Sequence, residues 1–181
     1  MLPEVLDLMA QHQAKATFFV TAEHMEGVTP SMVERLLADG HELANHCTQD
    51  RAYDHEPRAR FLADLEATNQ LLTRLGSPSP RWFRAPMGKV SQTMLEVLED
   101  RGMEHVMLDC YGQDTEIPDG QFIAEILLRH LRSGSIFLIH MPERGMREWN
   151  FDAMERCLSG LSSRGLRAVT VSTLSDAASV R

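Results

Sequence analysis

Apolar residues follow two different spacings along this chain, and the two kinds of segment alternate. In one kind, apolar residues recur every three or four positions, which is typical of one face of an α-helix. In the other kind, three to five mostly apolar residues follow one another directly, which is typical of a buried strand. The short runs predict strands at Ala16–Val20, His41–Ala44, Arg81–Phe83, His105–Leu108, Ile136–Ile139 and Ala168–Val171.

Glycines and capping residues mark the ends of the predicted helices. Glycine adopts the left-handed backbone that ends a helix, so a glycine before a short apolar run indicates a helix-to-strand turn. This pattern occurs four times, at Gly40, Gly102, Gly134 and Gly165. Start signals agree with it, because residues that favour the first position of a helix stand at Thr29 (before Pro30), Ser91 and Asn150.

The alternation of about six strands with helices predicts a single α/β domain over residues 1–181, with a parallel sheet covered by helices. The longest helix is expected from about Pro57 to Leu75, and another is expected to begin near Leu2. The proline-rich stretch Ser77–Pro80 is expected to form a stiff loop before a strand.

Composition narrows the classes of partner. The chain has 18 Lys and Arg against 26 Asp and Glu, a net charge of −8, and no basic run. Nucleic acid is therefore not an expected partner, because binding to phosphates requires cations. No apolar stretch approaches the roughly 18 residues of a membrane span, so no membrane partner is expected either. No basic segment of a signal peptide precedes Pro3, and the cellular location stays open.

Three scattered cysteines, with no pair two residues apart, argue against a disulfide framework and against a cysteine zinc site. Two of them, Cys47 and Cys110, fall near predicted strand ends. Each is expected either to lie close to a site or to be a buried, unreactive thiol.

Three of the predicted strands are followed at once by a side chain capable of chemistry. His46, Arg84 and His140 stand at these positions. In a protein built from successive strand–helix units, the carboxyl ends of parallel strands open onto one face. The three side chains are therefore expected to converge in one hydrolytic centre.

His46 and Asp50 form a candidate metal site. Imidazole nitrogen and carboxylate oxygen both suit Zn²⁺, and a spacing of four residues brings them together if a helical turn follows the strand. The alternative is that His46 is a hydrogen-bonded structural residue and Asp50 a helix cap.

Arg84 is followed by Pro86 and Gly88, which stiffen and turn the chain directly after a strand. A guanidinium aimed in this way can hold a carboxylate in its ionised form. The alternative is an ordinary ion pair at the surface.

His140 ends a nearly all-apolar run, and its ordinary pKa near 6.5 allows it to donate a proton near neutral pH. Asp109 ends the apolar run before it and is expected to orient or charge the imidazole. The alternative is that Asp109 is only a turn residue.

Together these segments resemble the polysaccharide deacetylase family, the NodB-homology domain of carbohydrate esterases. The resemblance covers essentially the whole chain, in order. Its second strand and second to fifth motifs correspond to Ala16–Val20, Gly40–His46, Phe83–Gly88, Met107–Asp109 and Gly134–His140.

The resemblance implies a distorted (β/α) barrel and a metal-dependent hydrolase of non-peptide carbon–nitrogen bonds. Such an enzyme removes acetyl groups from an N-acetylated glycan, for example a chitin-like polymer or another N-acetylglucosamine oligo- or polysaccharide. The cofactor would be a divalent metal, Zn²⁺ first, with Co²⁺ and Ni²⁺ as alternatives.

The resemblance also implies a role for each matching residue. His46 and Asp50 would bind the metal, and His140 would be the general acid. Arg84 would orient the base, and Asp109 would support the Arg–base or His network. Substrate contacts would come from three residues: Leu138, lining the pocket for the acetyl methyl group, Pro86, and Trp149 in the loop after His140. Ordinary packing is the alternative for Trp149 and for the other tryptophan, Trp82.

The chain departs from the family pattern at two places. The second motif usually carries a second His where Asp50 stands here, and a carboxylate can still bind a divalent ion. His55 is a poorer substitute. The first motif, Thr-Phe-Asp-Asp-Gly-Pro, supplies the base and one metal-binding Asp, but the 181 residues contain no Asp-Asp pair. Asp7 does not replace it, because it lies in a predicted helix.

Two explanations are compatible with this departure. In one, the first strand is missing, and the open sheet edge beside Ala16–Val20 favours self-association. In the other, a natural variant has lost catalysis and kept a sugar-binding groove.

Three functions are therefore open. The first is a deacetylase that is impaired as printed and would be restored by an upstream strand bearing Asp-Asp. The second is a non-catalytic carbohydrate-binding barrel. The third is an unrelated metal hydrolase or a structural α/β domain.

Overall fold

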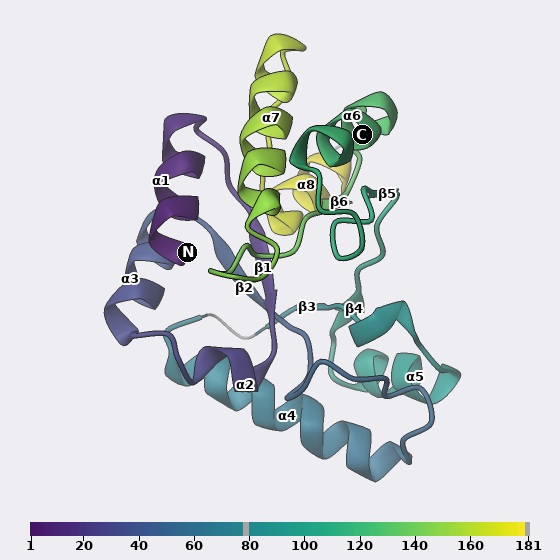
Figure 1. Cartoon of the computed structure of the whole chain (residues 1–181). Helices are drawn as coiled ribbons and strands as arrows, with labels where there is room; N and C mark the ends of the chain where they lie inside the picture. The colour runs from purple at the N-terminus through teal and green to yellow at the C-terminus, as the bar shows by residue number, and fades with distance from the viewer. Residues whose placement is uncertain (78–79, 180–181) are drawn as a thin grey trace. The chain divides into compact units, whose positions relative to one another are not determined.

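The computed structural model describes residues 1–77 and 80–179, in which the strands form two parallel sheets (Figure 1). The chain divides into two compact units, one formed by Thr17–Met107 and the other by Met1–Ala16 with Leu108–Arg181. Each unit contains one of the sheets. The single domain over residues 1–181 stays a prediction, and part of the expected loop at Ser77–Pro80 lies outside the described residues.

The unit Thr17–Met107 contains a four-stranded parallel sheet in the order β1-β2-β3-β4 (Figure 1). Its strands are β1 (Thr17–Val20), β2 (Glu42–Asn45), β3 (Trp82–Phe83) and β4 (Glu104–His105). Its helices are α2 (Ala22–Met25), α3 (Pro30–Ala38), α4 (Arg58–Arg74) and α5 (Gln92–Asp100), with a short 3-10 turn η1 (Pro86–Gly88). The four strands and the longest helix confirm the predictions for this part of the chain, with strand bounds shifted by one to three residues.

The core of this unit joins β3 to α4 and α5. Phe61 of α4 and Phe83 of β3 are fully buried, with ring centroids 5.7 Å apart in an edge-to-face arrangement. Met94 and Val97 of α5 belong to the same buried cluster. Because apolar burial of this kind stabilises by about 1.5–3 kcal/mol per large side chain, it holds the end of β3 firmly against the helices.

The other unit contains a two-stranded parallel sheet, β5 (Cys110–Tyr111) and β6 (Phe137–Leu138). Its helices are α1 (Leu2–Gln11), α6 (Gly120–His130), α7 (Trp149–Ser163) and α8 (Val171–Ser179). Helices α6 and α7 lie side by side (Figure 1). Gly160 lies at their contact, where a Cβ would lie 2.5 Å from the Leu128 side chain and that side chain would have to shift.

The strand expected at Ala168–Val171 is wrong. Val171 begins α8, and the hydroxyl of Thr170 accepts a hydrogen bond from the backbone N–H of Thr173 at 3.2 Å. A short apolar run cannot by itself be assigned to a strand or a helix, and the helix-capping capacity of Thr170 decides for the helix. Strand β5 was not expected.

Two of the three expected helix starts are confirmed, at Thr29 and Ser91. The third is wrong, because the residue before α7 is Glu148 and Asn150 lies inside the first turn. Trp149 therefore begins α7. The expectation from the sequence, that Trp149 lies in a loop, is wrong.

Strand pairing among residues 1–77 and 80–179 forms these two sheets and no closed ring. The α/β class with parallel strands is confirmed, and closure into a distorted barrel stays a prediction. In the same residues, no helix is long and apolar enough to cross a membrane.

Candidate active site

His46 follows the end of β2 and is half-buried. Its backbone N–H donates to the carbonyl of Val20 at 3.1 Å, which continues the pairing of β2 with β1. Its ring atom Nδ1 lies 2.7 Å from the backbone carbonyl oxygen of Arg84. Because a carbonyl only accepts, Nδ1 carries the proton, and the lone pair of the neutral ring is on Nε2. This is the arrangement that suits a metal-binding histidine.

The turn at His46 is made by its two neighbours. Asn45 is fully buried, and its side-chain oxygen accepts from the backbone N–H of Cys47 at 2.8 Å. Its amide nitrogen donates to the carbonyl of Leu65 at 2.9 Å and to the side chain of Asn69 at 2.7 Å, both on α4. Cys47 adopts a left-handed backbone with φ 65°, which directs the chain away from the sheet. The end of β2 is thus tied to α4 on both sides of His46.

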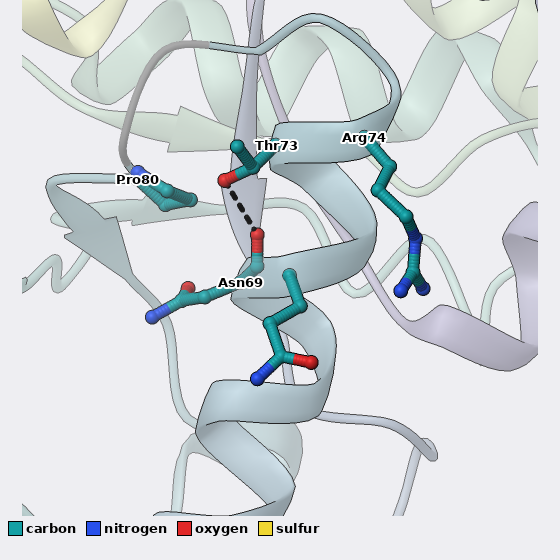
Figure 2. Close-up of a pocket in the computed structure, with 5 residues that line it drawn as sticks. Asn69, Thr73, Arg74 and Pro80 are labelled. Atoms are coloured by element: carbon teal, nitrogen blue, oxygen red, sulfur yellow. Dashed lines mark hydrogen bonds between the residues drawn. The ribbon is translucent and has the colours of Figure 1, made fainter.

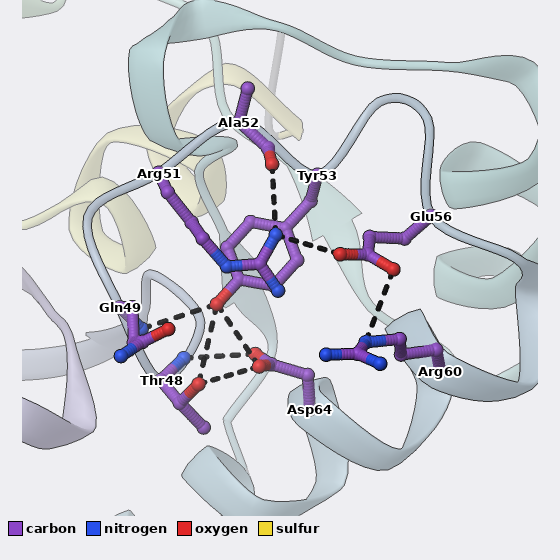
Figure 3. Close-up of polar contacts among 8 residues, drawn as sticks. All are labelled: Thr48, Gln49, Arg51, Ala52, Tyr53, Glu56, Arg60 and Asp64. Atoms are coloured by element: carbon purple, nitrogen blue, oxygen red, sulfur yellow. Dashed lines mark hydrogen bonds and ion pairs between the residues drawn. The ribbon is translucent and has the colours of Figure 1, made fainter.

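The loop after His46 is held by one carboxylate of α4. Asp64 accepts from the backbone N–H of Thr48 at 2.9 Å, from the Thr48 hydroxyl at 2.5 Å and from the hydroxyl of Tyr53 at 3.0 Å (Figure 3). The Tyr53 oxygen in turn accepts from the backbone N–H of Gln49 at 3.2 Å. Burial raises the pKa of Tyr53, and the nearby Asp64 raises it further. This network fixes the loop between His46 and α4.

Asp50 lies in that loop and is exposed. No helical turn follows β2, because residues 48–50 form a bend, and so the geometric reason for expecting Asp50 beside His46 is wrong. The alternative of a helix cap is also wrong. The backbone N–H of Asp50 donates to the Glu23 side chain at 3.0 Å. Metal binding by Asp50 stays a prediction.

The metal-site prediction depends on His46 as well. Nε2 of His46 has the protonation that a metal ligand needs, but no group of three or more His, Cys, Asp or Glu side chains is arranged to hold a metal ion within residues 1–77 and 80–179. Metal binding by His46 therefore stays a prediction, as it does for Asp50.

Arg84 follows β3, and only 9% of the residue is exposed. Its Nε donates to the carbonyl of Val106 at 3.2 Å, and its guanidinium lies 4.2 Å from the centre of the Phe19 ring. Burial lowers the pKa of Arg84 to about 10. In the part of the chain that the structure describes, no carboxylate forms an ion pair with this guanidinium, so the alternative of a surface ion pair is wrong. Pro86 is buried and begins η1, as its predicted turn requires.

His140 follows β6 and is held by a carboxylate that sequence reasoning missed. Nδ1 of His140 lies 2.9 Å from Oδ1 and 3.2 Å from Oδ2 of Asp114, and the backbone N–H of His140 donates to Oδ2. Asp114 is fully buried, whereas the His140 side chain is 35% exposed. An ionised carboxylate only accepts, so it places the ring proton on Nδ1 and leaves Nε2 for proton exchange.

The expectation that Asp109 orients His140 is wrong. Asp109 accepts from the Ser135 hydroxyl at 3.0 Å and from the backbone N–H of Ile136 at 2.7 Å. It precedes β5, whereas His140 follows the parallel strand β6, so the two residues lie at opposite ends of this sheet. Asp114 follows β5 at the same end as His140. A carboxylate shortly after a strand is a candidate site residue. Because strand β5 was not predicted, Asp114 was not recognised as one.

The residues around His140 include two of the predicted substrate contacts. Leu138 is half-buried and pairs with Tyr111 of β5, whose ring lies 6.3 Å from the His140 ring. Trp149 donates from its indole N–H to the backbone carbonyl of Asp114 at 3.0 Å and packs on the core of α6 and α7. Packing is thus the observed role of Trp149, and contacts of Leu138, Pro86 and Trp149 with a substrate stay predictions.

The predicted residues fall into two groups, one in each unit. His46 and Arg84 are in direct contact in the unit Thr17–Met107. His140 lies in the other unit with Asp114, Leu138 and Trp149. Convergence of His46, Arg84 and His140 in one centre stays a prediction. A shallow cavity between α4 and Pro80 contains none of these residues; it is lined by Asn69, Gln70, Thr73, Arg74 and Pro80 (Figure 2).

Comparison with known proteins identifies the family. The polysaccharide deacetylase sequence pattern matches residues 1–106, which include β1 to β4 and the His46 and Arg84 motifs. The chain belongs to the polysaccharide deacetylase family. This confirms the resemblance on which the sequence interpretation depends.

Two relatives show how far the similarity extends. A peptidoglycan-N-acetylglucosamine deacetylase of Bacillus cereus is 27% identical over 95% of this chain. A chitooligosaccharide deacetylase of Sinorhizobium fredii is 30% identical over 90% of it. The chain spans 62% of the length of the first relative and 80% of the second.

Solved structures confirm the fold. A peptidoglycan N-acetylglucosamine deacetylase in complex with 4-naphthalen-1-yl-N-oxidanyl-benzamide has a TM-score of 0.89 and 25% identity, covering 96% of this chain and 80% of that one. A family 4 carbohydrate esterase pseudoenzyme of Bacillus anthracis has a TM-score of 0.85 and 20% identity, covering 96% and 59%. One fold therefore occurs both in proteins named as enzymes and in one named a pseudoenzyme.

Proposed function

We propose that this chain is a metal-dependent hydrolase that removes N-acetyl groups from an N-acetylglucosamine oligo- or polysaccharide. The observation that carries the proposal is the His140–Asp114 pair, at 2.9 Å, in which a partly exposed imidazole is backed by a fully buried carboxylate. An imidazole held in this way has the geometry that general acid catalysis requires. The names of the two relatives supply the substrate class.

In this proposal, His46 and Asp50 hold a divalent cation, Zn²⁺ first, with Co²⁺ and Ni²⁺ as alternatives. His46 would use Nε2, because Nδ1 donates to the carbonyl of Arg84. The cation would polarise the acetamide carbonyl and lower the pKa of water. The buried Arg84 guanidinium would orient the carboxylate that acts as base.

His140 would complete the hydrolysis. Cleavage of the amide breaks the carbon–nitrogen bond, the oxygen of water ends in acetate, and the amine nitrogen needs a proton. Nε2 of His140 would supply that proton, since Asp114 holds the proton on Nδ1. Leu138, on β6 two residues before His140, would contact the acetyl methyl group. Pro86 would stiffen the turn that fixes the direction of Arg84.

We further propose that the activity of the chain as printed is low, because its 181 residues contain no Asp-Asp pair to supply the base and another metal ligand. The same observation favours a second function, a non-catalytic barrel of this family that binds carbohydrate. The two functions share the glycan partner and differ in catalysis.

Acetate release tests the proposal. The full chain is incubated with Zn²⁺ or Co²⁺ and chitin oligomers, and acetate is measured beside the variants His46→Gln and His140→Gln. His130→Gln is the matched control, because His130 is an exposed histidine at the end of α6. Release that requires the metal, His46 and His140, but not His130, supports the deacetylase.

Calorimetric titration with the same oligomers separates the second function. Binding without acetate release identifies the carbohydrate-binding protein and overturns the deacetylase. Neither binding nor release overturns both.

A further inference from the structure

The first turn of α7 donates two hydrogen bonds to Asp114. The indole N–H of Trp149 donates to the backbone carbonyl of Asp114 at 3.0 Å. The side-chain nitrogen of the next residue, Asn150, donates to Oδ2 of the same aspartate at 2.9 Å. Helix α7 thus holds both the backbone and the carboxylate of the residue that supports His140.

Asn150 also holds His140 itself. Its side-chain nitrogen donates to the backbone carbonyl of His140 at 3.0 Å. Both partners of this nitrogen are acceptors, so the NH₂ end of the amide must face them, and its orientation follows from chemistry. One buried NH₂ group therefore bridges the two members of the pair.

The orientation leaves the other end of the amide without a partner. Asn150 is fully buried, and its Oδ1 makes no hydrogen bond within residues 1–77 and 80–179. An unsatisfied buried polar atom costs about 1–3 kcal/mol. A small apolar residue at this position would avoid that cost. The contribution of Asn150 therefore comes from the two hydrogen bonds that its NH₂ group donates.

The NH₂ group decides which oxygen of Asp114 receives the imidazole. Oδ2 already accepts from Asn150 and from the backbone N–H of His140. The shorter contact of Nδ1 is accordingly with Oδ1, at 2.9 Å against 3.2 Å for Oδ2. Asn150 thus fixes the rotation of the carboxylate and, through it, the position of the ring proton.

We propose that Asn150 is a positioning residue that holds the Asp114–His140 pair with the imidazole proton on Nδ1. Its value for catalysis rests on the proposed deacetylase, in which Nε2 of His140 exchanges the proton. Its effect on the imidazole does not depend on metal, substrate or turnover, and is measured without them.

Histidine ¹⁵N NMR on the full chain tests this, at a pH where the ring is neutral. The wild type is expected to show mainly the Nδ1–H form of His140. Asn150→Ala is expected to lower the ratio of the Nδ1–H to the Nε2–H form by about fivefold or more. Leu158→Ala, which removes a buried side chain from the same helix without touching Asp114, is expected to leave the ratio within about twofold.

The outcomes separate positioning from general loosening of α7. A wild-type ring mainly in the Nε2–H form overturns the proposal without any variant. An unchanged ratio in Asn150→Ala overturns it, and so does an equal change in Leu158→Ala. If Asn150→Ala does not fold, Asn150→Leu, which is of similar size and lacks the NH₂ donor, takes its place with the same expected direction.

Kinetics distinguish the failure of this inference from the failure of the proposed function. If the chain releases acetate, Asn150→Ala is expected to lower kcat about tenfold and to change KM by less than twofold. Unchanged kcat with a changed NMR ratio would leave the positioning role intact and overturn His140 as the general acid.

Discussion

The ring nitrogen Nδ1 of His46 lies 2.7 Å from the backbone carbonyl oxygen of Arg84. Two motifs that are 38 residues apart are therefore joined by one hydrogen bond. The contact uses the backbone of Arg84, so the ring proton of His46 is set by the path of the chain after β3 rather than by the guanidinium. The guanidinium keeps its own direction, toward Val106 and the Phe19 ring.

Replacing Arg84 by Met should increase the stability of the folded chain. Burial lowers the pKa of Arg84 to about 10, so the folded chain holds this proton less tightly than the unfolded chain does. Burying the charged guanidinium therefore destabilises the folded chain. This cost is complete below about pH 10 and falls as the pH rises above that value. After subtracting the lost hydrogen bond and ring contact, Arg84→Met is expected to raise the free energy of unfolding by about 1 kcal/mol at pH 7.

Urea unfolding at pH 7 and above pH 10 measures this difference, which should shrink at the higher pH. The ¹⁵N spectrum of His46 should stay unchanged, because the carbonyl of residue 84 remains. A variant that is clearly less stable than wild type at pH 7 would show that the guanidinium has a stabilising partner.

Replacing Asp64 by Asn should loosen the loop after His46. Asp64 accepts three hydrogen bonds from Thr48 and Tyr53, and an amide would turn its own N–H₂ group toward at least one of those donors. We expect a loss of about 2–3 kcal/mol in the free energy of unfolding. If His46 and Asp50 bind metal, calorimetric affinity for Zn²⁺ should fall about tenfold.

Glu66→Gln is the matched control for Asp64. Glu66 lies two residues further along α4 and forms only an exposed ion pair with Arg101, which is worth less than about 1 kcal/mol. Equal effects of the two substitutions on unfolding would contradict a special role for Asp64.

Asp109 and Asp114 should respond differently to the same substitution. Asp114→Asn places an amide against the donors of His140 and Asn150 and is expected to destabilise by about 2–4 kcal/mol and to disturb the His140 ring proton. Asp109→Asn affects only the hydrogen bonds to Ser135 and Ile136. We expect it to lower the free energy of unfolding by about 1 kcal/mol. Thermal unfolding and the ¹⁵N spectrum of His140 distinguish them. A disturbed His140 in Asp109→Asn alone would restore the original sequence-based assignment.

The three cysteines should resist thiol reagents in the folded chain. Burial raises the pKa of Cys47 far above its usual value and that of Cys157 to about 12, and burial is also the main cause of the raised pKa of Cys110. Because the thiolate is the reactive form, we expect negligible labelling at pH 8 and complete labelling in denaturant. Rapid labelling of folded Cys47 would show that the loop after β2 opens.

The pattern of apolar positions determined most of the elements, since burial of one helix face or one short strand leaves a period that survives in the sequence. It also placed His46, Arg84 and His140 after strands. It could not determine which carboxylate supports His140, because that depends on strand pairing. Asp109 and Asp114 are only five residues apart, and the two-residue strand between them puts them at opposite ends of the sheet.

Tertiary structure alone decided the roles of Asn45, Asp64 and Asn150. Each is a polar residue that hydrogen-bonds to partners at least ten residues away in the chain, and no local period marks those contacts. The sequence determined where the chemistry-bearing side chains stand along the chain. Packing of the helices against the strand ends decided which atoms of those side chains are held, because hydrogen bonds between distant residues form only once burial brings them together.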